Sequence, residues 1–342
     1  MKKLFACLFF ISSLACLSQD AQYSQFYSNP IYLNPAFSGT GDNTRIVAIH
    51  RIQWPNLPQA FSNSTVSIDY NGDNINSGFG FIAHQEKEGT AALQSTTASF
   101  IYSYNANLNN RVVIRPAIKF GYVFRSIDQT KLILGDQVDF GIDGTPSQDP
   151  QINAIRLKNY WDIGTGVLIY TKKSWFGLAV DHLSHPNRSL LEGEDRLPLR
   201  YSVHIGSRYP LQKLIPVGTI APTIAPSILY RRQGNFQQLD AGASVHLQPV
   251  IIGLYYRGLP ILNNPAGRIN QDAVILLAGV EYLNFELAYS FDLNISKLDP
   301  VAGGGAHEFA IVYNFKLPRS PYKPPRTQRR LGCPVFVKRL NN

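Results

Sequence analysis

Apolar and polar residues alternate with a period of two along most of the chain. In residues 284–292 the apolar positions are Phe285, Leu287, Tyr289 and Phe291, and the positions between them are mostly polar. Successive side chains of a strand point to opposite faces, so this pattern predicts strands with one apolar and one polar face. Strands with an apolar face toward lipid and a polar face toward a wet lumen are typical of transmembrane β-barrels.

Fourteen segments carry this alternation. They are approximately 44–53, 61–71, 77–85, 93–106, 111–125, 159–170, 174–184, 198–209, 220–231, 236–248, 250–257, 272–282, 284–292 and 305–316. The number is even, as in single-chain bacterial barrels whose two termini lie on one side. A soluble β-sandwich or propeller would also alternate, but the chain shows no domain linker and no internal repeat. The pattern therefore predicts an all-β outer-membrane β-barrel of about fourteen antiparallel strands.

The connections between these segments alternate in length, which predicts how the barrel faces the two sides of the membrane. The odd-numbered connections are mostly long: 54–60, 86–92, 126–158, 185–197, 258–271 and 293–304. The even-numbered ones are mostly short: 72–76, 107–110, 171–173, Pro249 and Leu283. Two connections depart from the rule, because 210–219 is long for a turn and 232–235 is short for a loop. Barrels of this class have long outer loops and short periplasmic turns, so we expect the long set outside the cell.

The two ends of the chain differ from the barrel region. Lys2 and Lys3, followed by an apolar stretch up to Leu14, indicate a secretory signal peptide, with cleavage expected after Ser18. A lipoprotein signal at Cys16 is a weaker alternative. We therefore expect a signal peptide (1–18), an N-terminal periplasmic leader (19–43) with two Asn-Pro turns, the transmembrane β-barrel (44–316) and a periplasmic basic tail (317–342). Cleavage leaves Cys333 as the single cysteine and excludes an intramolecular disulfide.

Positive charge is concentrated at the ends of the chain. The formal net charge is +9, but the signal region contributes two lysines and residues 316–342 contribute eight basic residues and no acid. Residues 19–315 therefore carry a net charge of −1. This distribution, in an exported protein, argues against nucleic acid as a partner.

The C-terminal tail predicts a docking element. Its prolines favour an extended polyproline II path without internal hydrogen bonds, and its end is apolar. A basic, extended peptide with an apolar end is suited to a groove or a sheet edge of a periplasmic protein, although a solvated tail is the simpler alternative. The residues that we expect to bind a partner are Arg326, Arg329, Arg330, Val335, Phe336 and Val337.

The segment 23–40, with the sequence YSQFYSNPIYLNPAFSGT, resembles the beginning of the PorP/SprF family. The resemblance continues through Arg51, Gln53-Trp54-Pro55, Phe61, residues 160–170 and residues 181–187. It implies an outer-membrane barrel of the type IX secretion and gliding machinery of Bacteroidetes. The implied partners are outer-membrane lipid, a secreted surface protein with a type IX C-terminal domain, and periplasmic or lipoprotein components of the machinery. It leaves open whether the chain is a core secretion component or serves a single adhesin.

One catalytic arrangement is conceivable. His182 and Ser184 are two residues apart on a predicted strand and would share a face, with Glu192 nearby as an orienting group, as in some outer-membrane lipid hydrolases. Polar residues are ordinary where a strand enters a loop, so we expect no enzyme activity.

Metal and phosphate sites have little support in the sequence. The loop acids Asp136, Asp139, Asp143 and Asp149 could hold calcium, but solvated surface acids are the simpler interpretation. Gly303-Gly304-Gly305 is not followed by Lys-Ser or Lys-Thr and predicts an outer loop, not a phosphate loop. We expect no cofactor.

Three functions are compatible with these features. The first is a non-enzymatic outer-membrane component that docks secreted proteins and periplasmic partners. The second is a passive transporter or channel for small solutes, because a fourteen-stranded barrel can enclose a lumen. The third is the lipid hydrolase. Copurification of large partners separates the first from the second.

Overall fold

A single closed β-barrel accounts for nearly all of the regular structure in the computed structural model. The structure describes residues 20–41, 44–57, 60–72, 75–89, 93–127, 157–189, 193–211, 222–263, 269–295, 304–316 and 333–335. Within these ranges, no helix is long and apolar enough to cross a membrane.

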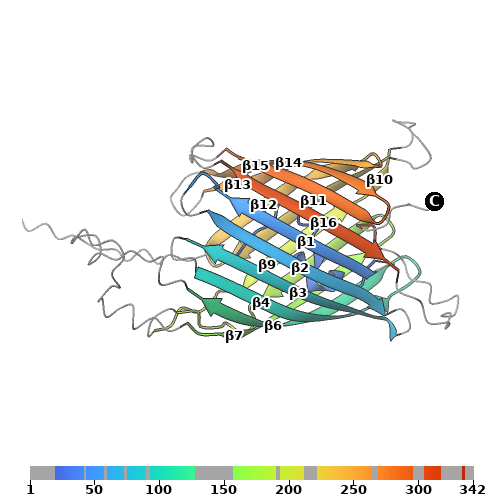
Figure 1. The fold of residues 1–342 in the computed structure, drawn as a ribbon. Coiled ribbons are helices and arrows are strands. Elements are labelled where there is room, and N and C mark those ends of the chain that lie inside the picture. Colours follow the sequence, from blue (N-terminus) through green and yellow to red (C-terminus); the bar gives the residue numbers. More distant parts are fainter. Residues whose placement is uncertain are drawn as a thin grey trace, which may run out of the picture.

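Fourteen long strands form the wall, as the alternation predicts (Figure 1). They are β1 (Thr44–Gln53), β2 (Phe61–Gly72), β3 (Ser77–Glu88), β4 (Leu93–Tyr104), β6 (Val113–Ser126), β7 (Tyr160–Tyr170), β8 (Ser174–Asp181), β9 (Arg200–Ser207), β11 (Thr223–Gln233), β12 (Phe236–His246), β13 (Val250–Asn263), β14 (Ile269–Tyr282), β15 (Phe285–Asn294) and β16 (Ala306–Phe315). Two-residue strands, β5 (Ala106–Asn107) and β10 (Tyr209–Pro210), pair with β6 and β11.

The sheet is antiparallel throughout and closes on itself. Each long strand pairs with its neighbours in sequence, and β16 pairs with β1 in a register that sets Phe315 opposite Thr44. Two ends of the barrel can therefore be named. The long-loop end is where β8 ends at Asp181 and β11 ends at Gln233, and the turn end is where β1 begins and β16 ends.

The predicted strand bounds are close to the observed ones. β1 has the predicted bounds, and the largest difference is at β13, which continues to Asn263 where the alternation predicted an end at residue 257. The register of β13 against β14 shifts between Arg257 and Gly258, and this irregularity breaks the period of two. The unexpectedly short connection near residue 233 is a tight turn, in which Gly234 adopts a φ of 55°.

The two faces of the wall differ as the pattern requires. Large apolar side chains such as Phe81, Phe100 and Phe120 are 46–51% exposed on the outside, whereas charged residues such as Arg115 and Glu308 are buried on the inside. An apolar outer face suits a lipid environment, since transfer of apolar surface out of water is favourable. The inner face must instead satisfy many buried polar groups.

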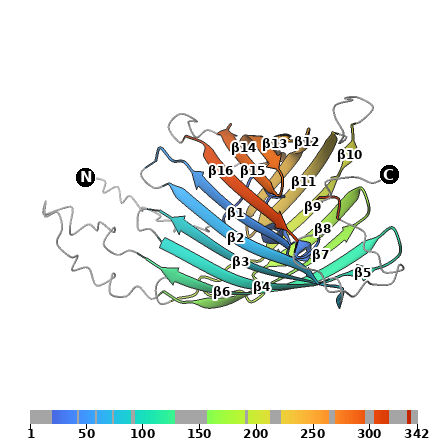
Figure 2. The same cartoon turned by 45° about the vertical axis from the view of Figure 1, so that its right-hand side comes forward.

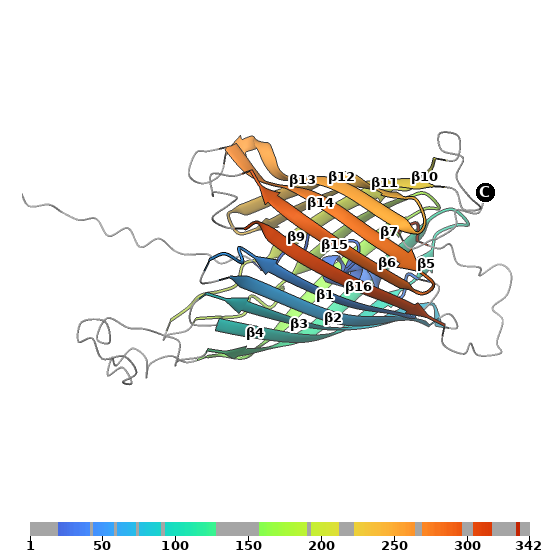
Figure 3. The same cartoon turned by 45° about the horizontal axis from the view of Figure 1, so that its top comes forward.

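The leader lies inside the barrel. Figures 2 and 3 show the blue N-terminal segment, with helix α1 (Pro30–Leu33) and the 3-10 helix η1 (Pro35–Phe37), enclosed by the strands. The sequence predicted a periplasmic leader at 19–43, and in the structure residues 20–41 lie in the lumen of the barrel. Inward glycines make room for it, because a Cβ on Gly78 would lie 2.1 Å from the carbonyl oxygen of Ser38.

Candidate functional site

The leader crosses the lumen from one end of the barrel to the other. At the long-loop end, Asp20 pairs with Arg200 at 2.9 Å and its backbone N–H donates to the side chain of Gln233 at 3.1 Å. At the turn end, the N–H of Gly39 donates to Asp69 at 2.9 Å. The chain then enters β1, so the leader is connected covalently to the wall at the turn end.

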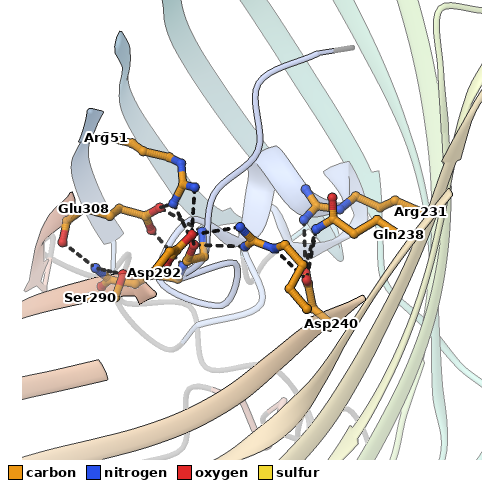
Figure 4. A network of polar contacts seen from close by, with 10 residues as sticks. Arg51, Arg231, Gln238, Asp240, Ser290, Asp292 and Glu308 are labelled. Carbon is orange, nitrogen blue, oxygen red and sulfur yellow. Dashed lines mark hydrogen bonds and ion pairs between the residues drawn. The ribbon is translucent and has the colours of Figure 1, made fainter. Parts of the chain in front are cut away.

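A buried network of charges holds the first half of the leader (Figure 4). The Asp292 carboxylate on β15 accepts from Arg51 on β1 at 2.7 Å, from Arg257 on β13 at 2.8 Å, and from the leader hydroxyl of Ser24 at 2.7 Å. Arg257 also pairs with Asp240 on β12 at 2.9 Å. Isolated charges could not be buried in this way, and the network pairs each one with an opposite charge.

Glu308 on β16 makes the most direct contact with the leader backbone. Its two carboxylate oxygens accept the N–H groups of Ser24 at 2.8 Å and Gln25 at 2.7 Å, and one of them also contacts Arg51 at 3.2 Å. Backbone N–H groups in an irregular segment need partners when water is excluded. A carboxylate with two acceptor oxygens satisfies two of them at once.

Two further contacts hold the second half of the leader. The Asn34 amide donates to the carbonyls of Val167 and Leu178, both at 3.2 Å, and lies 3.1 Å from His204. Arg115 on β6 donates to the carbonyl of Ser38 at 2.6 Å. Asn34 thus binds carbonyl groups of the wall, and Arg115 binds a carbonyl group of the leader, so the leader is held in place without being part of the sheet.

Aromatic side chains pack the leader against the wall near the centre of the lumen. Phe26 lies edge-on to Tyr255 with ring centroids 5.6 Å apart, and Tyr27 lies edge-on to Trp175 at 5.4 Å and accepts its indole N–H at 3.0 Å. Edge-to-face pairs of this kind are favourable beyond the area that they bury. The same cluster includes buried Cys333 from the tail.

A cavity of about 390 Å³ lies beside the leader at the long-loop end. Inward positions of β3, β4, β6 and β7 form its outer wall, and the leader residues Asp20 and Tyr32 line its inner side. Its lining mixes carboxylates, arginines and hydroxyl groups with a few aliphatic side chains. A volume of this size is in the range of small-ligand sites.

His182, the candidate general base, is part of the leader contact and not of a catalytic pair. Its two ring nitrogens lie 3.0 Å from Asp162 and 2.6 Å from Asp20. Ser184 donates its hydroxyl to the carbonyl of Trp161 at 2.9 Å. The expected shared strand face does not form, because β8 ends at Asp181 and His182 has a φ of 65°. The proposed orienting group at position 192 lies outside the described residues.

Electrostatics strengthen the contact between His182 and the leader. Burial alone would lower the pKa of His182, but the attraction of Asp20 and the hydrogen bonds to Asp162 and Asp20 outweigh it and raise this pKa to about 10. Burial would likewise raise the pKa of Asp20, yet the charges of His182 and Arg200 hold it well below its usual value. We conclude that both groups are charged near neutral pH.

The other predicted site residues are only partly within the described structure. Val335 is half-buried and packs against the lumen cluster that contains Cys333. Positions 326, 329, 330, 336 and 337 of the tail and the loop acids at 136, 139, 143 and 149 lie outside the described residues. In the part of the chain that the structure describes, no three side chains are grouped as metal ligands would be.

Comparison with known proteins gives a clear family match. A family model described as "Type IX secretion system membrane protein PorP/SprF" matches residues 15–313. Among solved structures, the CymD monoaromatic hydrocarbon channel is similar over 85% of this chain and 93% of its own, with 13% identity and a TM-score of 0.42. For the P. putida toluene transporter TodX the values are 83%, 93%, 10% and 0.41. No curated protein matches the chain significantly.

Proposed function

Because the chain belongs to the PorP/SprF family of type IX secretion system membrane proteins, we propose that it is a non-enzymatic docking component of that machinery in the outer membrane. In this role it holds secreted surface proteins that carry a type IX C-terminal domain. It also contacts periplasmic or lipoprotein components of the secretion and gliding machinery. The family match confirms the resemblance that the N-terminal segment suggested.

The observation that carries this proposal is the occupied lumen. Residues 20–41 run along the barrel and are held by ion pairs and hydrogen bonds to at least six strands, including the network around Asp292 and Glu308. A passive channel needs a continuous open path, and a segment fixed in the lumen works against one. A docking protein needs a rigid barrel with exposed loops, and an internal segment that ties opposite walls together provides rigidity.

The basic tail supplies a second proposed contact. We assign partner binding to Arg326, Arg329, Arg330, Phe336 and Val337 on the strength of their charge and apolar character alone. Val335 differs, since it packs against the lumen cluster and would have to leave it in order to bind a partner.

Affinity purification from cells that contain the secretion system tests the proposal. The full-length protein, tagged in an outer loop, should copurify a secreted surface protein and at least one periplasmic component, and in a planar bilayer it should conduct poorly. A protein that brings down no partner and conducts ions or solutes freely would instead be a passive channel.

A further inference from the structure

Three hydroxyl groups line the cavity at the long-loop end in a straight row. Ser95, Thr97 and Ser99 occupy alternate positions of β4, so all three point into the lumen. Among the described residues, none of the three hydroxyls has a hydrogen-bond partner. Their oxygens are not among the buried side-chain atoms that lack a partner, so all three hydroxyl groups are open to the cavity and available to a molecule that enters it.

Charged groups with unused hydrogen-bonding capacity flank this row. Arg125 on β6 donates one guanidinium N–H to the carbonyl of Arg188, and its other side-chain N–H groups have no partner among the described residues. Glu86 uses one carboxylate oxygen toward His84 and the N–H of Ala21, and Asp162 uses one toward His182. Among the described residues, the second oxygen of each carboxylate has no hydrogen-bond partner. The cavity therefore offers donors and acceptors together.

From this arrangement we propose that the cavity binds an extended, uncharged polar peptide segment along β4. The inference rests on the proposed docking function, in which the segment belongs to a secreted surface protein. Alternate residues of a strand repeat every 6.6–6.8 Å or so, and so do the like-facing backbone groups of an extended peptide. The hydroxyl row spans about four residues of such a peptide.

The balance of charge in the cavity favours a neutral segment. Other charged groups on the lining are already paired: Lys119 with Asp181, Arg200 with Asp20, and Arg188 with Asp195. A charged ligand would compete for one member of such a pair. The other member would then be left desolvated without its partner, which is costly. A peptide main chain offers one N–H donor and one carbonyl acceptor per residue, which matches hydroxyls and half-used carboxylates.

Peptide binding to the purified full-length protein in nanodiscs tests the proposal. The probe is a fluorescent, end-blocked octapeptide of alternating threonine and asparagine, measured by anisotropy. The wild type should bind it saturably, and the S95A/T97V/S99A variant should bind it at least about tenfold more weakly, since each hydrogen bond typically contributes a few-fold to tenfold. The control is Thr96→Val, which removes a hydroxyl from the same strand that instead contacts Gln85, and it should bind like the wild type.

Each result decides the matter for this site. Equal binding by the triple variant and the wild type, or no saturable binding at all, would overturn the proposal. Saturable binding of fluorescently labelled maltohexaose in the absence of any peptide binding would show a glycan site and overturn it too. Heat-modifiable migration in gels confirms that each variant forms a barrel. If the wild type copurifies a secreted protein but binds no peptide, the docking function stands and the peptide site fails. If it binds the peptide but copurifies no protein, the peptide site stands and the docking function fails.

Discussion

Replacing Glu308 by glutamine should release the leader while leaving the barrel folded. The amide has the shape of the carboxylate but only one acceptor oxygen, so it can accept only one of the N–H groups of Ser24 and Gln25. It also removes the negative charge beside Arg51, 3.2 Å away in a fully buried site. The first loss falls directly on the contacts that join the leader to the wall, and the second weakens the β1–β16 pair beside them.

The magnitude follows from the burial of these groups. A buried backbone N–H of the leader that loses its charged acceptor costs about 1.5–3 kcal/mol, because no water replaces the lost hydrogen bond, whereas Arg51 keeps its pair with Asp292. At about 1.4 kcal/mol per factor of ten, the opening equilibrium of the leader should rise roughly 10- to 10²-fold. Hydrogen–deuterium exchange of the protein in nanodiscs measures this as a loss of protection in residues 20–41, with β13 as the internal reference.

A matched control and a milder variant make the result decisive. Glu194→Gln removes a charge that is paired with Arg196 on the surface, where both side chains are more than half exposed, and should change no exchange rate measurably. Ser24→Ala removes the hydroxyl that contacts Asp292, Arg51 and Arg257 and should loosen the leader by about 1–3 kcal/mol. If both leader variants keep wild-type protection in an assembled barrel, the network does not hold the leader.

Four further outcomes are expected. Because the pKa of His182 is raised from 6.5 to about 10, its stabilising charge is complete below about pH 6.5 and lost as the pH rises through about 10; leader protection, corrected for intrinsic exchange, should fall over that upper range and persist at pH 6. Burial raises the pKa of the Cys333 thiol to about 12, so iodoacetamide should label it slowly until denaturant is added. A cysteine introduced at Ser147 should react with an impermeant reagent on intact cells, and labelling only after the membrane is broken would reverse the assigned sides. Truncation after Leu317 should leave a heat-modifiable barrel that loses its periplasmic partners on affinity purification.

The strands could be predicted from the sequence because each one repeats a simple physical pattern. Every strand in a barrel of this class has one apolar and one polar face, and the alternation of Phe285, Leu287, Tyr289 and Phe291 is visible without any tertiary information. The predicted bounds are least accurate where the geometry departs from a regular strand, as at the register shift after Arg257.

The position of the leader could not be predicted in the same way. Its contacts are scattered over distant positions: Asp20 meets His182 and Arg200, and Gln25 meets Glu308. No local periodicity encodes such pairs. A signal was nevertheless present, because mid-strand inward positions carry paired charges of both signs, such as Arg257 and Asp292, that a water-filled lumen does not require.

The leader and the cavity are parts of one structure, which links the two proposals. Asp20 and Tyr32 form the inner side of the cavity, and Arg200 contacts both of them, at 2.9 Å and 3.4 Å. His182 joins Asp20 to Asp162, which also lines the cavity. A peptide bound along β4 would therefore rest on a surface that exists only while the leader is in place. Release of the leader by Glu308→Gln should weaken peptide binding even though Glu308 is not part of the cavity lining.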